Sequence, residues 1–295
     1  MQVIITDHHL TTKATPDAEA VVNPNQLGCE FPSKALAGVG VAFYLLANLS
    51  SHRSKLSKSS SKISDYLDLV ALGTYADVAS LDYNNRILVD AGLKRIQRKQ
   101  CRAGISALLD IAGRDPAQLK AQDLGFVLGP RINAAGRMET MDIGIECLLA
   151  DDLQTAYPLA QQLNQLNIER RHVEADMKQQ ALSALASLSL DSVQLPAALI
   201  LFEPHWHQGV ISIVAGRLKE QFHRPSIVFA ADEDGIHLKG SARSIEGVHI
   251  RDAIELIAEQ HPQLISHFGG HAAAAGLTLK KIHFEPFKQA FEQLI

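Results

Sequence analysis

The sequence has few aromatic residues, few cysteines and no long apolar run. Aromatic side chains make up 5% of its 295 residues, so aliphatic side chains must do most of the packing in any core. The three cysteines, Cys29, Cys101 and Cys147, are scattered and odd in number, which argues against a disulfide framework or a cysteine zinc site. We expect them to be buried free thiols in a reducing compartment.

A membrane-spanning segment is also missing from the sequence. The most apolar stretch, residues 38–49, is shorter than the roughly 20 residues that a spanning helix needs. The first residues lack the basic start and long apolar run of a signal peptide. We therefore predict a cytoplasmic protein that makes no contact with a membrane.

The numbers of positive and negative side chains are nearly equal, so the net charge does not indicate a strongly charged binding partner. Lys and Arg number 28 and Asp and Glu 32, which gives a net charge of -4. This balance excludes a global basic field of the kind that marks many nucleic-acid-binding proteins. Any recognition of phosphate must come from local groups. The length and the 46% hydrophobic content suit two domains of ordinary size.

Apolar β-branched runs that alternate with helical periodicity predict an α/β fold with buried parallel strands. Residues 152–190 show helical periodicity without glycine and predict one long helix, or two joined helices, connecting two domains. The predicted domains are residues 1–150, a helical connector 151–195, and residues 196–295. We predict strands over 2–6, 198–202, 226–231 and 277–279, a helix starting at Pro32 with Ser33 as N-cap, a solvated loop over 50–64, helices over 65–72, 84–99, 210–222, 250–258 and 284–294, and short helices over 103–150.

Asp7, His8 and His9 directly follow the first predicted strand. Active sites of open α/β sheets lie at the carboxyl ends of strands. Imidazole and carboxylate together suit Mn²⁺ or a similar divalent ion. The tripeptide also occurs by chance, and the alternative is that Asp7 caps a turn while both histidines are solvated.

A lone acidic residue, Asp77, stands in the otherwise apolar segment 72–78, after a predicted helix that ends at Gly73. An unpaired buried carboxylate is costly, so this residue requires a partner or a metal ion. The alternative is an aspartate that caps the next turn.

Residues 129–137 read as a loop bounded by glycines that carries Arg131, Asn133 and Arg137. Guanidinium and amide groups on such a loop could hold phosphates through charge-assisted hydrogen bonds. Taken alone, such residues more often form surface salt bridges.

The C-terminal part offers a second group of anion-binding candidates. Ser241 and Arg243 supply a hydroxyl and a guanidinium. Gly269 and Gly270 precede His271 and a run of alanines, and side chains this small allow backbone amides to approach an anion. The alternative is a helix N-terminus that packs through its alanines, with His271 as a cap.

His205 and His207 suggest a metal pair, but no third ligand stands at a suitable spacing. A metal site at this pair is therefore the weaker hypothesis.

Taken together and in order, the motifs resemble the DHH phosphoesterase superfamily, and within it the bacterial 5′→3′ exonucleases specific for single-stranded DNA. The resemblance covers essentially the whole chain. It implies a partial DHH parallel-sheet domain, a long connecting helix and a smaller α/β DHH-associated domain, with one DNA strand in a cleft between the domains. The matching segments are residues 3–9, 72–78, 128–137, 208–217, 239–244 and 268–276, the last carrying the Gly-Gly-His and Ala-Ala-Gly elements of the DHH-associated domain.

The resemblance also implies roles for individual residues in a two-metal hydrolysis that uses Mn²⁺ or Mg²⁺. His8 and Asp77 match metal ligands, and Asp7 matches a residue that supports the metal site. The other matches concern the substrate: His9 and His271 lie near the phosphate, Ser241 and Arg243 engage DNA phosphates beside Gly269 and Gly270, and Arg131, Asn133 and Arg137 face the cleft.

The sequence departs from the family pattern at both ends. The family's first two carboxylate motifs lie on strands before the Asp-His-His motif, and its oligonucleotide-binding domain follows the last motif. We therefore expect roughly half of a two-metal site and little or no nuclease activity from this chain alone.

Several explanations of this departure stay open. The chain is expected to be a fragment of a nuclease of DNA repair and recombination, or one piece of a split protein that works with an N-terminal fragment or other repair proteins. A non-catalytic nucleic-acid-binding remnant is a further alternative. So is a phosphodiesterase that acts on small nucleotides or short oligonucleotides.

Overall fold

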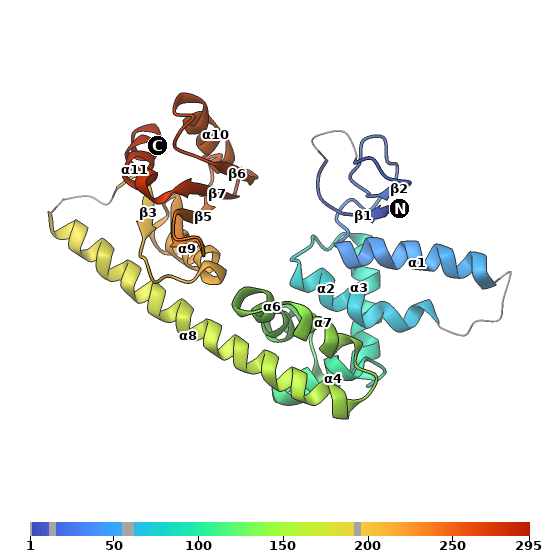
Figure 1. Cartoon of the computed structure of the whole chain (residues 1–295). Coiled ribbons are helices and arrows are strands. Elements are labelled where there is room, and N and C mark those ends of the chain that lie inside the picture. Colours follow the sequence, from blue (N-terminus) through green and yellow to red (C-terminus); the bar gives the residue numbers. More distant parts are fainter. Residues whose placement is uncertain (1, 12–15, 55–61, 192–195) are drawn as a thin grey trace. The chain divides into compact units, whose positions relative to one another are not determined.

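The computed structural model describes residues 2–11, 16–54, 62–191 and 196–295 (Figure 1). The chain divides into two compact units, residues 1–167 and 168–295, and the division falls inside a helix. Each unit has its own hydrophobic core. The arrangement of strands and helices confirms the predicted α/β class.

The N-terminal unit begins with a small parallel sheet. Strand β1 (Ile4–Thr6) pairs with β2 (Ala20–Val22), and Ile5 lies opposite Val21. The first strand confirms the prediction, whereas the second was not predicted. Among the described residues each of these strands has a single partner strand, and Ile4 is 63% exposed. One edge of β1 is therefore available for pairing.

The first helix starts later than predicted. Helix α1 spans Gly38–Ser54, so the prediction that Ser33 caps it was wrong. Ser33 is buried, and its hydroxyl donates a hydrogen bond of 2.7 Å to the carboxylate of Asp82. The first part of the predicted loop 50–64 is helical, residues 55–61 lie outside the described residues, and a 3₁₀ turn follows at Ile63–Tyr66.

Helix α2 (Leu67–Ala76) does not end at Gly73, contrary to the prediction. A Cβ atom at Gly73 would lie 2.6 Å from Cγ1 of Val39 on α1, so the glycine allows close packing of α1 and α2. Helix α3 (Tyr83–Gln97) confirms its prediction and is capped by the carboxylate of Asp82.

Short helices complete the N-terminal unit, as predicted for residues 103–150. Residues 121–138 are continuously helical, so the prediction of a loop over 129–137 was wrong. Pro130 lies in the first turn of α6, where its missing N–H is not needed, and this explains how the segment stays helical. The elements are α4 (Ala103–Ile111), a 3₁₀ turn (Pro116–Gln118), α5 (Ala121–Asp123), the π-helix η3 (Leu124–Leu128), α6 (Gly129–Met138) and α7 (Asp142–Leu149).

One helix of 39 residues, α8 (Leu153–Asp191), contains the division between the units. It confirms the single-helix form of the prediction for 152–190. Pro158 lies near its start and does not interrupt it. Among the described residues no helix is both long and apolar enough to cross a membrane.

The C-terminal unit is a mixed five-stranded sheet with the order β3-β4-β5-β7-β6. Strands β3 and β4 are parallel, and the remaining pairs are antiparallel. Helix α9 packs on β4 and β5, whereas α10 and α11 share a core with Phe229 of the sheet. The elements are β3 (Leu199–Phe202), α9 (Gln208–Phe222), β4 (Ser226–Ala231), β5 (His237–Arg243), α10 (Ile250–Gln260), β6 (His267–Gly270), β7 (Ala274–Lys280) and α11 (Phe284–Leu294).

Every strand and helix predicted for this unit is present, but β5 and β6 were not predicted. Both strands contain glycine, which is depleted in strands. Gly240 of β5 is required by packing, because a Cβ atom there would overlap the Phe229 ring. The observed strands place the two anion-binding motifs on neighbouring parts of one sheet.

Candidate metal and phosphate site

Asp7, His8 and His9 leave the carboxyl end of β1, and two asparagines at the end of β2 hold them. The side-chain nitrogen of Asn23 donates to Oδ2 of Asp7 (3.2 Å) and to the carbonyl of His9 (2.9 Å). The side chain of Asn25 donates to the carbonyl of His8 (2.7 Å). The backbone N–H of Asn25 in turn donates to Oδ1 of Asn23 (2.8 Å). The backbone of the histidine pair is thereby fixed by neighbouring strand ends.

Asn23 and Asn25 were missed by the sequence analysis. The available signal was the sequence Asn-Pro-Asn directly after the apolar residues of β2. Two polar residues at the carboxyl end of a strand beside β1 are candidates for the same site. Asn23 is only 2% exposed, and a buried amide with satisfied hydrogen bonds has a defined orientation.

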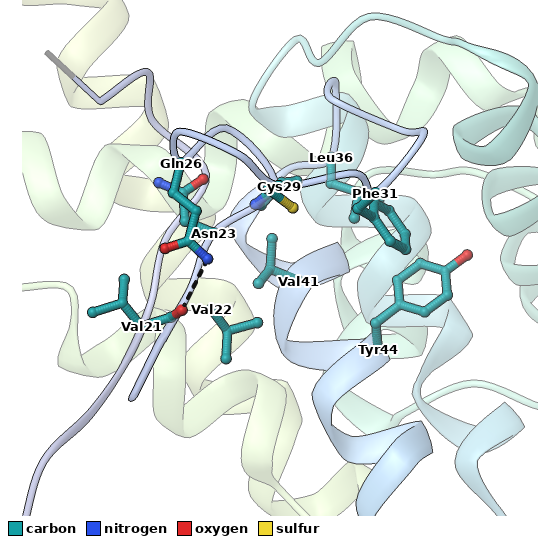
Figure 2. Close-up of a pocket in the computed structure, with 10 residues that line it drawn as sticks. Val21, Val22, Asn23, Gln26, Cys29, Phe31, Leu36, Val41 and Tyr44 are labelled. Carbon is teal, nitrogen blue, oxygen red and sulfur yellow. Dashed lines mark hydrogen bonds between the residues drawn. The ribbon is translucent and has the colours of Figure 1, made fainter. Parts of the chain in front are cut away.

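Asn23 also borders an apolar hollow of about 350 Å³ between β2 and α1 (Figure 2). Figure 2 shows Gln26 hydrogen-bonded to the carbonyl of Val21, and the half-buried Cys29 beside the same hollow.

All three cysteines are free, but only Cys147 is fully buried. The prediction of three buried thiols was therefore wrong for Cys29 and Cys101.

The carboxylate of Asp7 is tied to its neighbour His9. Nδ1 of His9 lies 2.7 Å from Oδ1 of Asp7, and the His9 backbone N–H donates to the same oxygen. The hydrogen bond from the His9 side chain lowers the pKa of the Asp7 carboxyl below its ordinary value. Asp7 is therefore held as an anion that orients His9 and accepts from Asn23.

His8 faces Asp77 across the unit. Nδ1 of His8 lies 3.7 Å from Oδ2 of Asp77, so the two side chains converge. Asp77 is the C-cap of α2 and its side chain is 46% exposed, so it is not the buried carboxylate that the apolar segment suggested. Its position beyond the last turn of the helix leaves the carboxylate turned toward His8.

The backbone after Asp77 is strained. Val78 has φ of 55°, although a β-branched residue rarely adopts the left-handed region. The N–H of Val78 donates to the carbonyl of Tyr75, and the N–H of Ala79 to that of Thr74, which completes a Schellman motif with valine where glycine is usual. Strain of this kind persists where surrounding structure imposes it, and it is concentrated at functional sites.

The separation of His8 and Asp77 fits two ligands of one divalent ion. With metal–ligand distances of about 2.1 Å, two ligands lie roughly 3.0 Å apart at a right angle and about 4.2 Å apart on opposite sides. The 3.7 Å between Nδ1 and Oδ2 falls inside this range. Imidazole and carboxylate are also a donor set that suits Mn²⁺. Within the described part of the chain, no group of three or more His, Cys, Asp or Glu residues could hold a metal ion.

Asp77 opens onto a cleft of about 500 Å³ between α2 and α6. Gly73 and Ala76 line one wall, and Asn133, Gly136 and Arg137 line the other, with Met141 at the edge. The structure thus places predicted residues from two distant motifs around one cleft. An amide and a guanidinium beside a carboxylate can bind a phosphate that bridges to a cation.

Arg131 points in a different direction from Asn133 and Arg137. Its Nε donates to the side chain of Asn164 on α8 (3.0 Å), and an NH group donates to the carbonyl of Val127 (2.7 Å). These bonds brace α6 against α8. Arg131 does not line the cleft.

In the C-terminal unit, three strands bring small and polar residues into register. Ser241 of β5 lies opposite Gly276 of β7, which lies opposite Gly269 of β6. Directly opposed residues of an antiparallel pair share a face, so Ser241 adjoins a surface without side chains. The guanidinium of Arg243 donates to the Ser241 hydroxyl (3.1 Å). Hydroxyl and guanidinium therefore stand together beside exposed backbone.

His271 lies in the tight turn between β6 and β7. Its N–H donates to the carbonyl of Ala274 (2.8 Å), and its side chain is exposed. Gly270 has φ of 147°, and a Cβ atom there would overlap the Ala274 carbonyl, so only glycine fits. The alternative of a helix N-terminus at this motif was wrong, because the segment is a β-hairpin.

His205 and His207 each have an ordinary structural partner. His205 lies 2.9 Å from the side-chain oxygen of Gln180, and His207 caps α9 by accepting from the N–H of Gly209. Among the described residues no metal cluster includes either histidine.

Comparisons with known proteins agree with this geometry. The DHH family, N-terminal domain, matches residues 1–74, and the DHHA1 domain matches residues 192–295. A crystal structure of exonuclease RecJ bound to manganese is 34% identical, with a TM-score of 0.79, and the match covers 99% of this chain and 68% of that one. The chain belongs to the RecJ family.

Other RecJ proteins support the assignment. The single-stranded-DNA-specific exonuclease RecJ of Haemophilus influenzae is 50% identical over 299 residues, covering 100% of this chain and 52% of the relative. RecJ of Thermus thermophilus in complex with Mn²⁺ is 34% identical, with a TM-score of 0.82, over 99% of this chain and 41% of that one. The chain spans about half the length of the curated RecJ relatives that it matches.

Proposed function

We propose that the chain carries part of the catalytic region of a metal-dependent exonuclease that degrades single-stranded DNA from the 5′ end in cytoplasmic DNA repair and recombination. The observation that carries the proposal is the 3.7 Å separation of His8 and Asp77 at the cleft lined by Asn133 and Arg137. The names of the RecJ relatives, which specify single-stranded DNA and exonuclease activity, support the reaction class.

His8 and Asp77 would hold a Mn²⁺ or Mg²⁺ ion, which supplies Lewis-acid activation of water and neutralises charge on the phosphate. The RecJ structures that contain manganese or magnesium support this choice of ion. Asp7 orients the histidine pair, because its carboxylate accepts hydrogen bonds from the side chains of His9 and Asn23. His9, whose side chain is 71% exposed, would contact the phosphate.

The remaining site residues bind and orient the strand. Asn133 and Arg137 donate to backbone phosphates in the cleft, and Arg131 positions their helix through Asn164 and Val127. In the C-terminal unit, Ser241 and Arg243 hold a second phosphate over the bare backbone of Gly269 and Gly270, with His271 in the adjoining turn. We propose that the functional domains are residues 1–150 and 196–295, joined by the connector 151–195.

We expect weak activity, or none, from this chain alone. Two convergent ligands, one imidazole and one carboxylate, hold a divalent ion less tightly than a complete set. An N-terminal fragment or another repair protein would supply further ligands if the chain works as part of a split enzyme.

The test is a calorimetric titration of the purified chain with Mn²⁺. His8→Ala and Asp77→Ala should each weaken binding about tenfold or more. His172→Ala is the matched control, because His172 is an exposed helical histidine outside the site. Binding that is equal in all four proteins would reject the metal assignment.

Two alternative functions can be distinguished by the preferred substrate and by whether DNA binding requires a metal ion. Turnover of a dinucleotide in preference to a long 5′-phosphorylated strand would indicate a small-nucleotide phosphodiesterase. DNA affinity that needs no Mn²⁺ and falls with salt, with no hydrolysis, would indicate a binding remnant.

A further inference from the structure

Phe126 is a large aromatic side chain that the fold leaves in solvent. It is 79% exposed, whereas Leu124, Val127 and Leu128 around it are buried. It lies in the π-helix η3, immediately before α6. π-Helical turns are rare and often occur at functional sites. In a sequence with 5% aromatic residues, an exposed phenylalanine seven residues before the cleft residue Asn133 calls for an explanation.

The helical segment 121–138 carries both Phe126 and the cleft residues Asn133 and Arg137. Its buried residues follow one stripe, which includes Leu128 and Ala135. Phe126 and Asn133 are exposed and Arg137 is half-buried, and the three residues follow one another along the same helical segment. The segment is helical throughout, so the positions of these three residues relative to one another are fixed.

The distances along this helix suit a single strand of nucleic acid. Phe126 and Asn133 are separated by roughly 10 Å along the axis at 1.5 Å per residue. Asn133 and Arg137 offer donors for phosphates, and Phe126 offers an apolar ring face. A base unstacked from its neighbours in a single strand can cover such a ring, whereas a base inside a duplex cannot.

We propose that Phe126 is a nucleobase-binding platform, on which one base of single-stranded DNA stacks while the adjoining phosphates occupy the cleft beside Asn133 and Arg137. This inference rests on the proposed function of that cleft. Stacking on an aromatic ring accepts every base, so the platform favours single strands without reading their sequence.

The experiment measures binding of the full chain to two fluorescent oligonucleotides with the same backbone. One is oligothymidylate, and the other carries abasic residues throughout. Phe126→Ala should weaken binding of oligothymidylate about tenfold, the usual effect of one lost base–aromatic contact, and leave binding of the abasic strand unchanged. Ile282→Ala is the matched control, because it removes an apolar side chain that is 78% exposed in the C-terminal unit.

A second variant keeps the result independent of any general loss of structure. Phe126→Trp should retain full affinity and add a fluorescent reporter, since Trp206 is the single native tryptophan and is 4% exposed. Oligothymidylate should quench the new emission, and the abasic strand should not.

The outcomes are distinguishable. Suppose that the unaltered chain binds oligothymidylate. If Phe126→Ala then lowers the affinity for both oligonucleotides equally, or for neither, the platform is rejected and the cleft assignment stands. If the unaltered chain binds neither strand, both the proposed function and the platform are rejected.

Discussion

The buried side-chain amide of Asn23 donates a hydrogen bond of 3.2 Å to the carboxylate of Asp7. The same nitrogen donates to the carbonyl of His9. Because Asn23 directly follows β2 and Asp7 directly follows β1, one amide joins the adjacent ends of two parallel strands. His8, the proposed metal ligand, stands between the two bonded residues. Asn23 therefore fixes the backbone on both sides of His8, although it is not itself one of the proposed metal ligands.

Replacing Asn23 with leucine should damage both stability and metal binding. The change removes three hydrogen bonds and leaves the carbonyl of His9 and the N–H of Asn25 without these partners, at a cost of about 2 kcal/mol in the free energy of unfolding. Mn²⁺ affinity should fall with it. Urea denaturation and calorimetry measure the two effects. Gln26→Ala, which removes one bond to Val21, is the control and should cost less than about 1 kcal/mol with unchanged Mn²⁺ affinity.

Alanine at Gly73 should destabilise the N-terminal unit, although alanine is the better helix former. The added methyl would lie 2.6 Å from Val39, and the resulting shift of α1 against α2 should cost about 1–3 kcal/mol. Gly216 in α9 provides the comparison, because no atom lies within 4 Å of a Cβ built there. Gly216→Ala should stabilise the protein by about 0.5–1 kcal/mol. Opposite signs in urea denaturation are the expected result, and equal signs would contradict the packing argument.

Glycine at Val78 should relieve backbone strain. Val78 is 86% exposed, so little packing is lost, and φ of 55° suits glycine better than valine. We expect a gain of about 1 kcal/mol in the free energy of unfolding. Lys99→Gly, at φ of 57° after α3, should give a similar gain. If the strain orients Asp77, Val78→Gly will also change the affinity for Mn²⁺, whereas Lys99→Gly will not. Equal Mn²⁺ affinities of the two variants would show that the strain has no role at the site.

Acid stability should depend on Asp234 in the turn before β5. Backbone and side-chain hydrogen bonds from His237 lower the pKa of the Asp234 carboxyl from 3.8 to about 2. A lowered pKa means that the folded state favours the anion. The stabilisation is complete above 3.8 and is lost as the pH falls toward about 2. Asp234→Asn should therefore show a shallower loss of stability over this range, measured by urea denaturation at successive pH values. Parallel curves for the variant and the unaltered protein would exclude the contribution.

Local patterns predicted the C-terminal unit well. The strand at 226–231 and the helix at 284–294 were predicted with their observed limits, because each has an apolar pattern bounded by polar residues or proline. Ser33, Gly73 and residues 129–137 were misread for a common reason. Serine, glycine and proline signal caps, ends and loops on average, but here tertiary packing determines their place. Gly73 permits a close helix contact that the sequence of α2 alone does not reveal.

For the site, the residue types were predictable and the distances were not. Asp7, His8 and Asp77 were predicted from their chemistry and from the family pattern, and the structure brings His8 and Asp77 within 3.7 Å of each other. The approach of His8 to Asp77 depends on the packing of β1, α1 and α2, which no local pattern specifies. Asn23 and Asn25 were missed because β2 is three residues long, too short to be recognised as a strand whose end matters.

The continuous helix through residues 121–138 has a consequence for substrate length. Because no loop interrupts the segment, the separation of Phe126 and Asn133 is set by the helical backbone between them. If the chain binds single-stranded DNA as proposed, a strand that reaches from Phe126 to Asn133 would contact both residues, whereas a single nucleotide would contact one. Under the proposed function, the affinity for single-stranded DNA should therefore fall sharply once the strand is too short to reach from Phe126 to Asn133.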